Sequence, residues 1–323
     1  MAPRSDADWL DAAAALAGRA RPLSRPNPGV GAIVVAKGRV IARGWTHAGG
    51  RPHAEAVALA AAGEAARGAT LYVTLEPCAH RSLRGPSCTS LVIASGIARA
   101  VVGCEDPDPR TAGTGIAALR EAGITVEVLP RAAARASLVG YLMRASAGRP
   151  HLTLKLATSL DGCIALADGT SKWITGPEAR AHAHLERACA DAILVGGGTL
   201  RADSPMLDVR LAGLEHRSPR RFVLTRGNVP EGWAAVSDLK APAAFGDAQY
   251  LMVEGGAGAG AAFLRADLVD RLLLYRAPIV IGGGRPSVGD IGLTSLDPAH
   301  GLWRMTQTRR LGSDHLEVYE RTR

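Results

Sequence analysis

The pattern of hydrophobic and polar residues in the first half of the chain switches between helix-like and strand-like periods. Apolar residues at helical spacing predict a helix over 7–20, and two apolar runs around Lys37-Gly38 predict a β-hairpin over 30–44. The pattern further predicts helices over 53–66, 89–95, 115–122 and 131–147, and strands over 69–77, 98–103 and 124–129. Strands that alternate with helices predict an α/β sheet covered on both faces.

A second α/β series begins after Arg149-Pro150. Its pattern predicts a strand over 151–162, a helix over 177–190, a strand running into a glycine loop over 191–200, a strand over 220–225, and a strand, glycine loop and helix over 249–270. Residues 227–248 are the least patterned and are expected to form a loop. The restart predicts two domains, residues 1–147 and 148–323.

The composition indicates packed domains, because 47% of the 323 residues are apolar and 21% are charged. No apolar run reaches the ~18 residues that would span a bilayer. Asp6, Asp8 and Asp11 interrupt what would be the apolar part of a signal peptide. Five cysteines without an export signal favour reduced thiols or metal ligands over disulfides. We therefore expect a cytoplasmic protein.

The net charge of +8 is compatible with phosphorylated metabolites, with nucleic acid, or with no particular partner. The chain has no run of five or six like charges, and its few aromatic residues, 4% of the total, do not alternate with basic ones. Both features argue against a nucleic-acid-binding surface.

The strongest chemical signal is a set of metal-ligating residue types. His53 and Glu55 begin a predicted helix, Cys78 follows a predicted strand, and Cys88 comes later, in the order typical of zinc deaminases. Such a zinc ion takes three protein ligands and keeps a fourth position for water, while the nearby glutamate moves protons. Nine residues separate Cys78 from Cys88 instead of the usual two, so Cys104 remains an alternative ligand on spacing alone.

Two glycine clusters follow strands in the second half, at 195–199 and 253–258. Glycines allow the backbone to approach phosphate, but they also occur simply as tight turns. Neither cluster opens the first strand-helix-strand unit with an acidic residue about 20 positions later. A classical dinucleotide-binding fingerprint is therefore a poor fit.

Several motifs together resemble the bifunctional deaminase/reductase family of riboflavin biosynthesis. They are the segments 26–31 (PNPGVG), 52–55 (PHAE), 74–80 (TLEPCAH), 106–109 (DPDP), 154–162 (LKLATSLDG), 171–175 (SKWIT), 193–196 (ILVG) and 253–256 (VEGG). The resemblance implies a cytidine-deaminase-like three-layer α/β/α domain, followed by an α/β domain similar to dihydrofolate reductase. A long loop between the two cysteines is a feature of that family and favours Cys88 as the third ligand.

The resemblance also implies roles for individual residues. His53, Cys78 and Cys88 would hold zinc, with Glu55 as the catalytic residue. Contacts to NADPH would come from Ala157, Trp173, Thr199, Asp203, Thr225 and the segment Gly256, Ala257, Gly258, Ala259, Gly260, Ala261 and Ala262. Contacts to substrate would come from Ser171, Arg187, Leu207, Arg210 and Glu254.

Three further substrate contacts follow partly from residue chemistry. Asn27 lies between two prolines, and its amide offers both a donor and an acceptor to a pyrimidine edge. His80 either touches substrate or supports the loop after Cys78. Lys155, near a strand end, is expected to supply charge or a proton near the reducing carbon of the sugar.

The expected function is zinc-dependent hydrolytic deamination of 2,5-diamino-6-(ribosylamino)pyrimidin-4-one 5′-phosphate, followed by NADPH-dependent reduction of the ribosyl group to ribityl. The expected partners are a phosphorylated pyrimidine and further copies of the chain, as a dimer or tetramer, with neither nucleic acid nor a membrane. The main alternative is a tRNA-editing zinc deaminase fused to an α/β domain. A non-catalytic zinc-binding scaffold also stays open. An enzyme with one inactive half is a further alternative, because the segment between Thr225 and Gln249 is shorter than is typical of the family.

Overall fold

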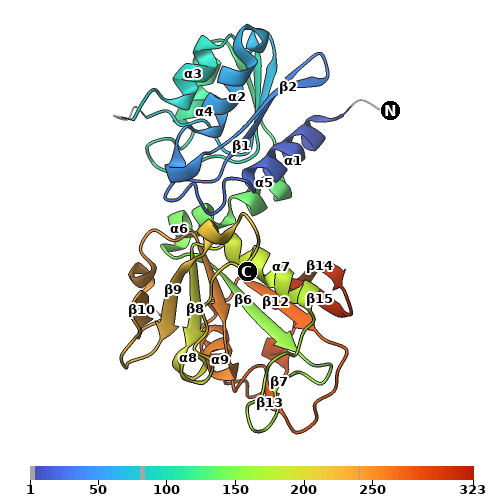
Figure 1. Cartoon of the computed structure of the whole chain (residues 1–323). Helices are drawn as coiled ribbons and strands as arrows, with labels where there is room; N and C mark the ends of the chain where they lie inside the picture. The colour runs from blue at the N-terminus through green and yellow to red at the C-terminus, as the bar shows by residue number, and fades with distance from the viewer. Residues whose placement is uncertain (1–3, 81–83, 240) are drawn as a thin grey trace. The chain divides into compact units, whose positions relative to one another are not determined.

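The computed structural model describes residues 4–80, 84–239 and 241–323. It divides into two compact units, and the division falls between Gly148 and Arg149 (Figure 1). Each unit is built on its own β-sheet and is considered by itself. None of the helices within the described ranges has the length and apolar character needed to cross a membrane.

The first unit contains a five-stranded sheet in the order β2-β1-β3-β4-β5. The strands β3, β4 and β5 are parallel, and β1 runs antiparallel to both of its neighbours. The strands are β1 Gly31–Ala36, β2 Arg39–Trp45, β3 Thr70–Val73, β4 Arg99–Val102 and β5 Thr125–Val128. The helices are α1 Asp6–Ala17, α2 Ala54–Ala62, α3 Cys88–Ala94, α4 Thr114–Glu121, α5 Ala132–Ser137 and α6 Val139–Ala147.

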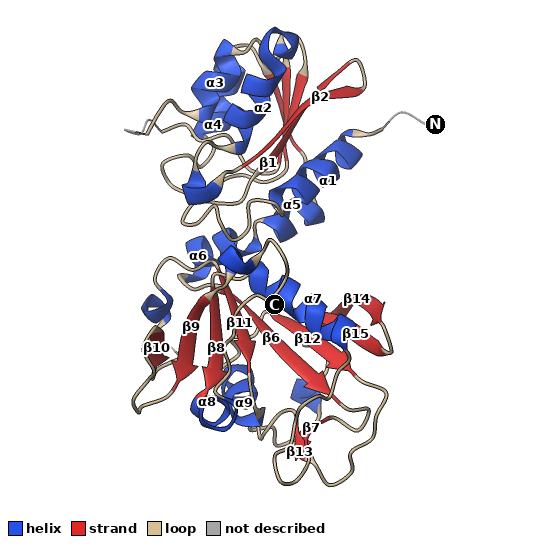
Figure 2. Cartoon of the chain, in the orientation of Figure 1, coloured by secondary structure: helices blue, strands red, loops and turns tan. Residues whose placement is uncertain are grey.

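Both faces of this sheet are buried, as the sequence predicts. Along β1, Ala32 and Val34 point into the larger core with α2 and α3, whereas Ile33 and Val35 point into a smaller core with Trp9 of α1. Figure 2 shows α2, α3 and α4 on one side of the sheet and α1 and α5 on the other. The three-layer α/β/α arrangement is therefore confirmed.

The second unit contains an eight-stranded sheet in the order β10-β9-β8-β11-β6-β12-β15-β14, and a separate pair of short strands, β7 and β13. The strands from β10 to β12 are parallel, while β15 and β14 add an antiparallel edge. The strands are β6 His151–Thr158, β7 Cys163–Ala165, β8 Ala192–Gly196, β9 Arg220–Leu224, β10 Trp233–Val236, β11 Tyr250–Glu254, β12 Arg271–Arg276, β13 Arg285–Pro286, β14 Trp303–Leu311 and β15 Asp314–Arg321. The helices are α7 Pro177–Ala188, α8 Gly197–Asp203 and α9 Ala257–Arg265.

Helices also cover both faces of the second sheet. Phe263 of α9 packs on the face that carries Leu154 and Leu194, and Ala183 of α7 packs on the face that carries Leu273. This unit is an α/β fold, as predicted. The parallel strands β6, β8 and β11 end together, and open α/β sheets bind ligands at such an edge.

Three segments differ from the sequence prediction. Residues 227–248 are not one continuous loop, because β10 extends the sheet beside β9 with Val236 fully buried; Lys240 lies outside the described residues. The glycine loop after β8 is a short helix, α8, that begins at Gly197. The helix predicted over 131–147 is two helices, since Leu138 leaves the helical conformation while its side chain is buried.

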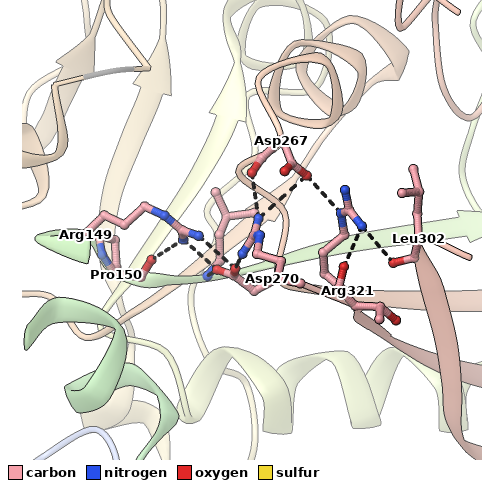
Figure 3. A network of polar contacts seen from close by, with 9 residues as sticks. Arg149, Pro150, Asp267, Asp270, Leu302 and Arg321 are labelled. Carbon is pink, nitrogen blue, oxygen red and sulfur yellow. Dashed lines mark hydrogen bonds and ion pairs between the residues drawn. The ribbon is translucent and has the colours of Figure 1, made fainter. Parts of the chain in front are cut away.

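A cluster of charged groups holds the ends of several strands of the second unit together (Figure 3). The carboxylate of Asp270 accepts two hydrogen bonds from Arg149, at 2.6 and 2.8 Å, and one from the backbone N–H of Leu152. Asp267 accepts a hydrogen bond from Arg321. These contacts connect the start of β6, the start of β12 and the end of β15.

Candidate active sites

Three potential metal ligands meet in the first unit. His53 caps the N-terminus of α2, Cys78 follows the end of β3, and Cys88 is the first residue of α3. The His53 Nδ1 atom lies 3.2 Å from Cys88 Sγ and 3.6 Å from Cys78 Sγ. All three ligand atoms are within 4.8 Å of one another. The long loop between the cysteines thus brings Cys88 back to Cys78.

Cys104, the alternative on spacing, is not part of this group among the described residues. Its thiol donates to the carbonyl of Glu105 instead. The structure therefore brings together the three residues that the resemblance implies, although Cys88 lies on another element and far from the usual spacing.

The two cysteines and Glu55 have perturbed acidities. The hydrogen bond between the two thiols lowers the pKa of Cys78 and raises that of Cys88, so the pair favours one thiolate. Burial raises the pKa of Glu55 to about 7. The Glu55 Oε2 atom is buried and has no hydrogen-bond partner among the described residues. A carboxylate in this state can exchange protons near neutral pH.

These residues fit a zinc ion. One imidazole nitrogen and two sulfurs form a typical donor set for a catalytic zinc site, which keeps a fourth position open. The three ligand atoms lie within 4.8 Å of one another, close enough for one metal ion to be bound by all three. The Glu55 carboxylate, whose Oε2 atom is buried without a hydrogen-bond partner among the described residues, lies outside this set of ligands.

Asn27 lies against His53, one of the three potential metal ligands. Its Nδ2 atom donates to the carbonyl of Gly50 and lies 3.2 Å from His53 Nε2. A Cβ atom at Gly50 would lie 2.6 Å from Asn27 Cγ, so only glycine fits there. His80, the other expected substrate contact, lies 3.4 Å from the hydroxyl of Thr111. No sequence pattern singles out Thr111.

The second unit contains a cavity of about 790 Å³ at the carboxyl ends of β6, β8 and β11. Most of the residues expected to bind NADPH or substrate line it: Lys155, Ala157, Ser171, Trp173, Arg187, Thr199, Asp203, Leu207, Arg210, Glu254, Gly256, Ala257, Gly258 and Ala259. Four expected residues, Thr225, Gly260, Ala261 and Ala262, are not part of the described lining. Gly260 and Ala261 are buried inside α9, which turns them away from the cavity.

Three of the charged side chains that line the cavity, Lys155, Arg187 and Glu254, form a buried cluster. Glu254 and Lys155 are paired in register on β11 and β6, and the Lys155 Nζ atom lies 3.9 Å from Glu254 Oε2. Arg187 from α7 donates to both oxygens of Glu254, at 2.6 and 2.9 Å. Burial would raise the pKa of Glu254, but the hydrogen bonds from Arg187 hold it below its usual value. Burial lowers the pKa of Lys155.

Sequence reasoning missed several residues that line the cavity. Arg180 and His184 lie on α7 at spacings of seven and three residues from Arg187, which puts all three on one helix face. This spacing could have identified Arg180 and His184 from the sequence. His184 accepts a hydrogen bond from the backbone N–H of Arg210. Arg180 stacks over the ring of Trp173, with the guanidinium 4.8 Å from the ring centroid.

Comparison with protein-family models assigns both halves of the chain. Residues 3–104 match the cytidine and deoxycytidylate deaminase zinc-binding region. Residues 150–249 and 235–316 match the RibD C-terminal domain. A deaminase-type zinc region is thus followed by a reductase-type domain in one chain.

Relatives cover the chain almost end to end. The riboflavin biosynthesis protein RibD of Aquifex aeolicus is 35% identical over 98% of both chains. Among solved structures, Acinetobacter baumannii RibD has a TM-score of 0.86 at 32% identity, covering 98% of this chain and 99% of that one. The diaminohydroxyphosphoribosylaminopyrimidine deaminase/5-amino-6-(5-phosphoribosylamino)uracil reductase of Thermotoga maritima also has a TM-score of 0.86, at 31% identity and the same coverage.

These matches span both units, so a tRNA-editing deaminase with an unrelated fused domain is not favoured. The chain belongs to the RibD family of riboflavin-biosynthesis proteins, bifunctional enzymes that join a zinc-dependent deaminase to an NADPH-dependent reductase.

Proposed function

We propose that the chain catalyses two consecutive steps on one phosphorylated pyrimidine. The first unit deaminates 2,5-diamino-6-(ribosylamino)pyrimidin-4-one 5′-phosphate by hydrolysis, and the second reduces the ribosyl group of the product to ribityl with NADPH. The observation that carries the proposal is the donor cluster of His53, Cys78 and Cys88 together with the buried carboxylate of Glu55, whose Oε2 atom has no partner among the described residues. The deaminase and reductase activities for which the Thermotoga maritima relative is named support the choice of substrate.

In the deaminase unit, His53, Cys78 and Cys88 would hold the zinc ion. When bound, zinc lowers the pKa of a water molecule and makes it a nucleophile near neutral pH. Glu55 accepts the proton that the attacking water releases and returns it to the departing amino group, so that ammonia leaves. Burial of Glu55 keeps its carboxylate away from bulk water during this transfer.

His80 and Asn27 complete the proposed deaminase site. His80 is half-buried beside Thr111 and is assigned to the substrate. Asn27 contacts His53 Nε2, and we place it between the ligand histidine and the pyrimidine.

In the reductase unit, the residues around the cavity position the sugar. Arg210 is the more exposed of the two cavity arginines assigned to substrate and suits the phosphate, because Arg187 is already paired with Glu254. NADPH bound at this cavity would supply a hydride to the former anomeric carbon of the open-chain imine. Lys155 donates a proton to the imine nitrogen, which completes the reduction to an amine.

The direct test uses zinc-replete protein and the diaminopyrimidinone phosphate. Ammonia release is followed first, and NADPH is then added and its oxidation followed. The proposal requires both signals in this order. Ammonia release without NADPH oxidation would overturn the reductase assignment. The absence of both signals would overturn the assignment of the substrate.

A cytoplasmic location and association into a dimer or tetramer are further parts of this proposal. Light scattering of the purified chain at micromolar concentration would give the mass of the particle. A particle with the 33.5 kDa mass of one chain would contradict the association.

A further inference from the structure

Tyr275 lies beside Lys155 in the reductase cavity, and no role has been assigned to it so far. Strand pairing sets Leu273 of β12 opposite Lys155 of β6, so Tyr275, two residues further along, is on the same face of the sheet. The Lys155 Nζ atom is 5.7 Å from the centroid of the Tyr275 ring. At this distance the face of an aromatic ring attracts an ammonium group.

The ring of Tyr275 is held in place from behind. Only 1% of Tyr275 is exposed, and its hydroxyl lies 2.8 Å from the Nδ1 atom of His182 on α7. The side chains of Ala179, Ala183, Leu273, Leu316 and Val318 pack around it in one core cluster. A ring fixed in this way can define the position of a flexible lysine.

The other attractive group near Lys155 is already engaged. Both oxygens of Glu254 accept hydrogen bonds from Arg187, which offsets part of the negative charge that Lys155 faces. The Lys155 Nζ atom is also 3.9 Å from Glu254, longer than a good hydrogen bond. The Tyr275 ring is therefore a second contact that can hold the ammonium group.

We propose that Tyr275 is a positioning residue of the reductase, whose ring face holds the Lys155 ammonium while His182 fixes the ring through the phenol hydroxyl. The inference rests on the proposed function of Lys155 as the proton donor. Tyr275 itself does not donate the proton, because its hydroxyl is directed at His182 and burial raises its pKa further above the ordinary value.

The test weakens the attraction between the ring at residue 275 and a cation while nearly preserving the shape of the ring. Tyr275→Phe keeps the ring, and phenylalanines with one, two and three ring fluorines at this position weaken the attraction of the ring face in steps. We expect kcat for NADPH oxidation to fall with each fluorine, to about tenfold in total, with KM for NADPH unchanged. Tyr275→Leu should lower kcat by about the same factor.

Two controls separate positioning from folding. Ammonia release by the same proteins should not change, because it takes place in the other unit. Phe245→Ala opens a cavity in the core on the opposite face of this sheet and should lower thermal stability with little effect on kcat. A flat response of kcat across the fluorinated series would overturn the inference, even if Tyr275→Leu fails to fold.

Lys155→Ala distinguishes this inference from the proposed function. If Lys155→Ala abolishes reduction while the fluorinated series is flat, Lys155 is the donor but Tyr275 does not position it. If Lys155→Ala leaves reduction unchanged, the proposed role of Lys155 fails, and the inference fails with it.

Discussion

The position of Glu55 was predicted from the sequence, but the surroundings of its carboxylate were not. The His-x-Glu spacing places it next to a ligand histidine, and the structure adds that its Oε2 atom is buried without a hydrogen-bond partner among the described residues. Such a group costs folding free energy unless something compensates for it. In the proposed mechanism, the water molecule and the amino group of the substrate supply its partners.

Replacement of Glu55 by glutamine tests this role. Glu55→Gln preserves size but cannot take up a proton, so we expect kcat for ammonia release to fall by about 10²–10⁴-fold. Zinc content should stay at the wild-type value, because Glu55 is not a member of the ligand cluster. Ammonia release at the wild-type rate would remove Glu55 from the mechanism.

Arg210 gives a second prediction for a single residue. Its side chain is more than half exposed at the cavity, and the proposed function assigns it to the substrate phosphate. Arg210→Ala should raise the substrate KM for reduction about tenfold or more, since a hydrogen bond to a charged group is lost. Arg265→Ala, which removes an exposed arginine of α9, is the matched control and should leave this KM unchanged. Equal losses of ammonia release and reduction in Arg210→Ala would argue against two separable sites.

Individual elements are joined by residues whose roles are invisible in the sequence pattern. Glu76, between β3 and Cys78, is 2% exposed and accepts hydrogen bonds from the backbone N–H groups of Asp106, Gly113 and Ile116. It therefore connects the turn that carries Cys78 to the start of α4. In the sequence, Glu76 stands out only as part of the motif at 74–80.

Glu76→Gln should loosen this connection. The amide keeps the size of the side chain but has one acceptor oxygen for three N–H groups, so we expect a loss of stability of about 1–3 kcal/mol. Because Cys78 lies two residues away, zinc should also be lost more readily to a chelator. Glu64→Gln, at an almost fully exposed position, is the control. Unchanged thermal stability and zinc retention would show that Glu76 has no anchoring role.

The order of the elements was largely predictable, but the edges of the sheets were not. The amphipathic helices and buried strands follow local periodicity, and α1, α2, α7 and β6 form where it predicts them. Residues 303–321 carry no assignment from the sequence, yet they form the hairpin of β14 and β15. The side chains of β14 are nearly all exposed, so this strand lacks the alternation that reveals a half-buried one.

For the molecule as a whole, the charged network at Asp270 predicts how stability depends on pH. Burial would raise the pKa of Asp270, but its hydrogen bonds with Arg149 and the positive charges nearby hold it below the ordinary value. A carboxylate with a lowered pKa stabilises the folded state above the unfolded pKa of about 3.9. This contribution is lost as the pH falls through the folded value.

Asp270→Asn should therefore destabilise the second unit at neutral pH by about 3 kcal/mol, because Arg149 loses its buried partner. The difference from the wild type should shrink as the pH falls below about 4. Amide hydrogen exchange in β6 and β12 measures this difference in stability for the second unit alone. A difference that stays constant down to low pH would contradict the linkage.

Most of the chemistry and the order of the elements follow from local patterns in the chain. Periodicity specifies a helix or strand within a few residues, and His53-x-Glu55 and Pro77-Cys78 carry their residue types at short spacing. Three contacts came from the folded arrangement instead: Cys88 in the donor cluster, Asn27 against His53, and Tyr275 beside Lys155. These contacts depend on the order and register of strands, which are set by packing between segments distant in the chain and leave no local pattern.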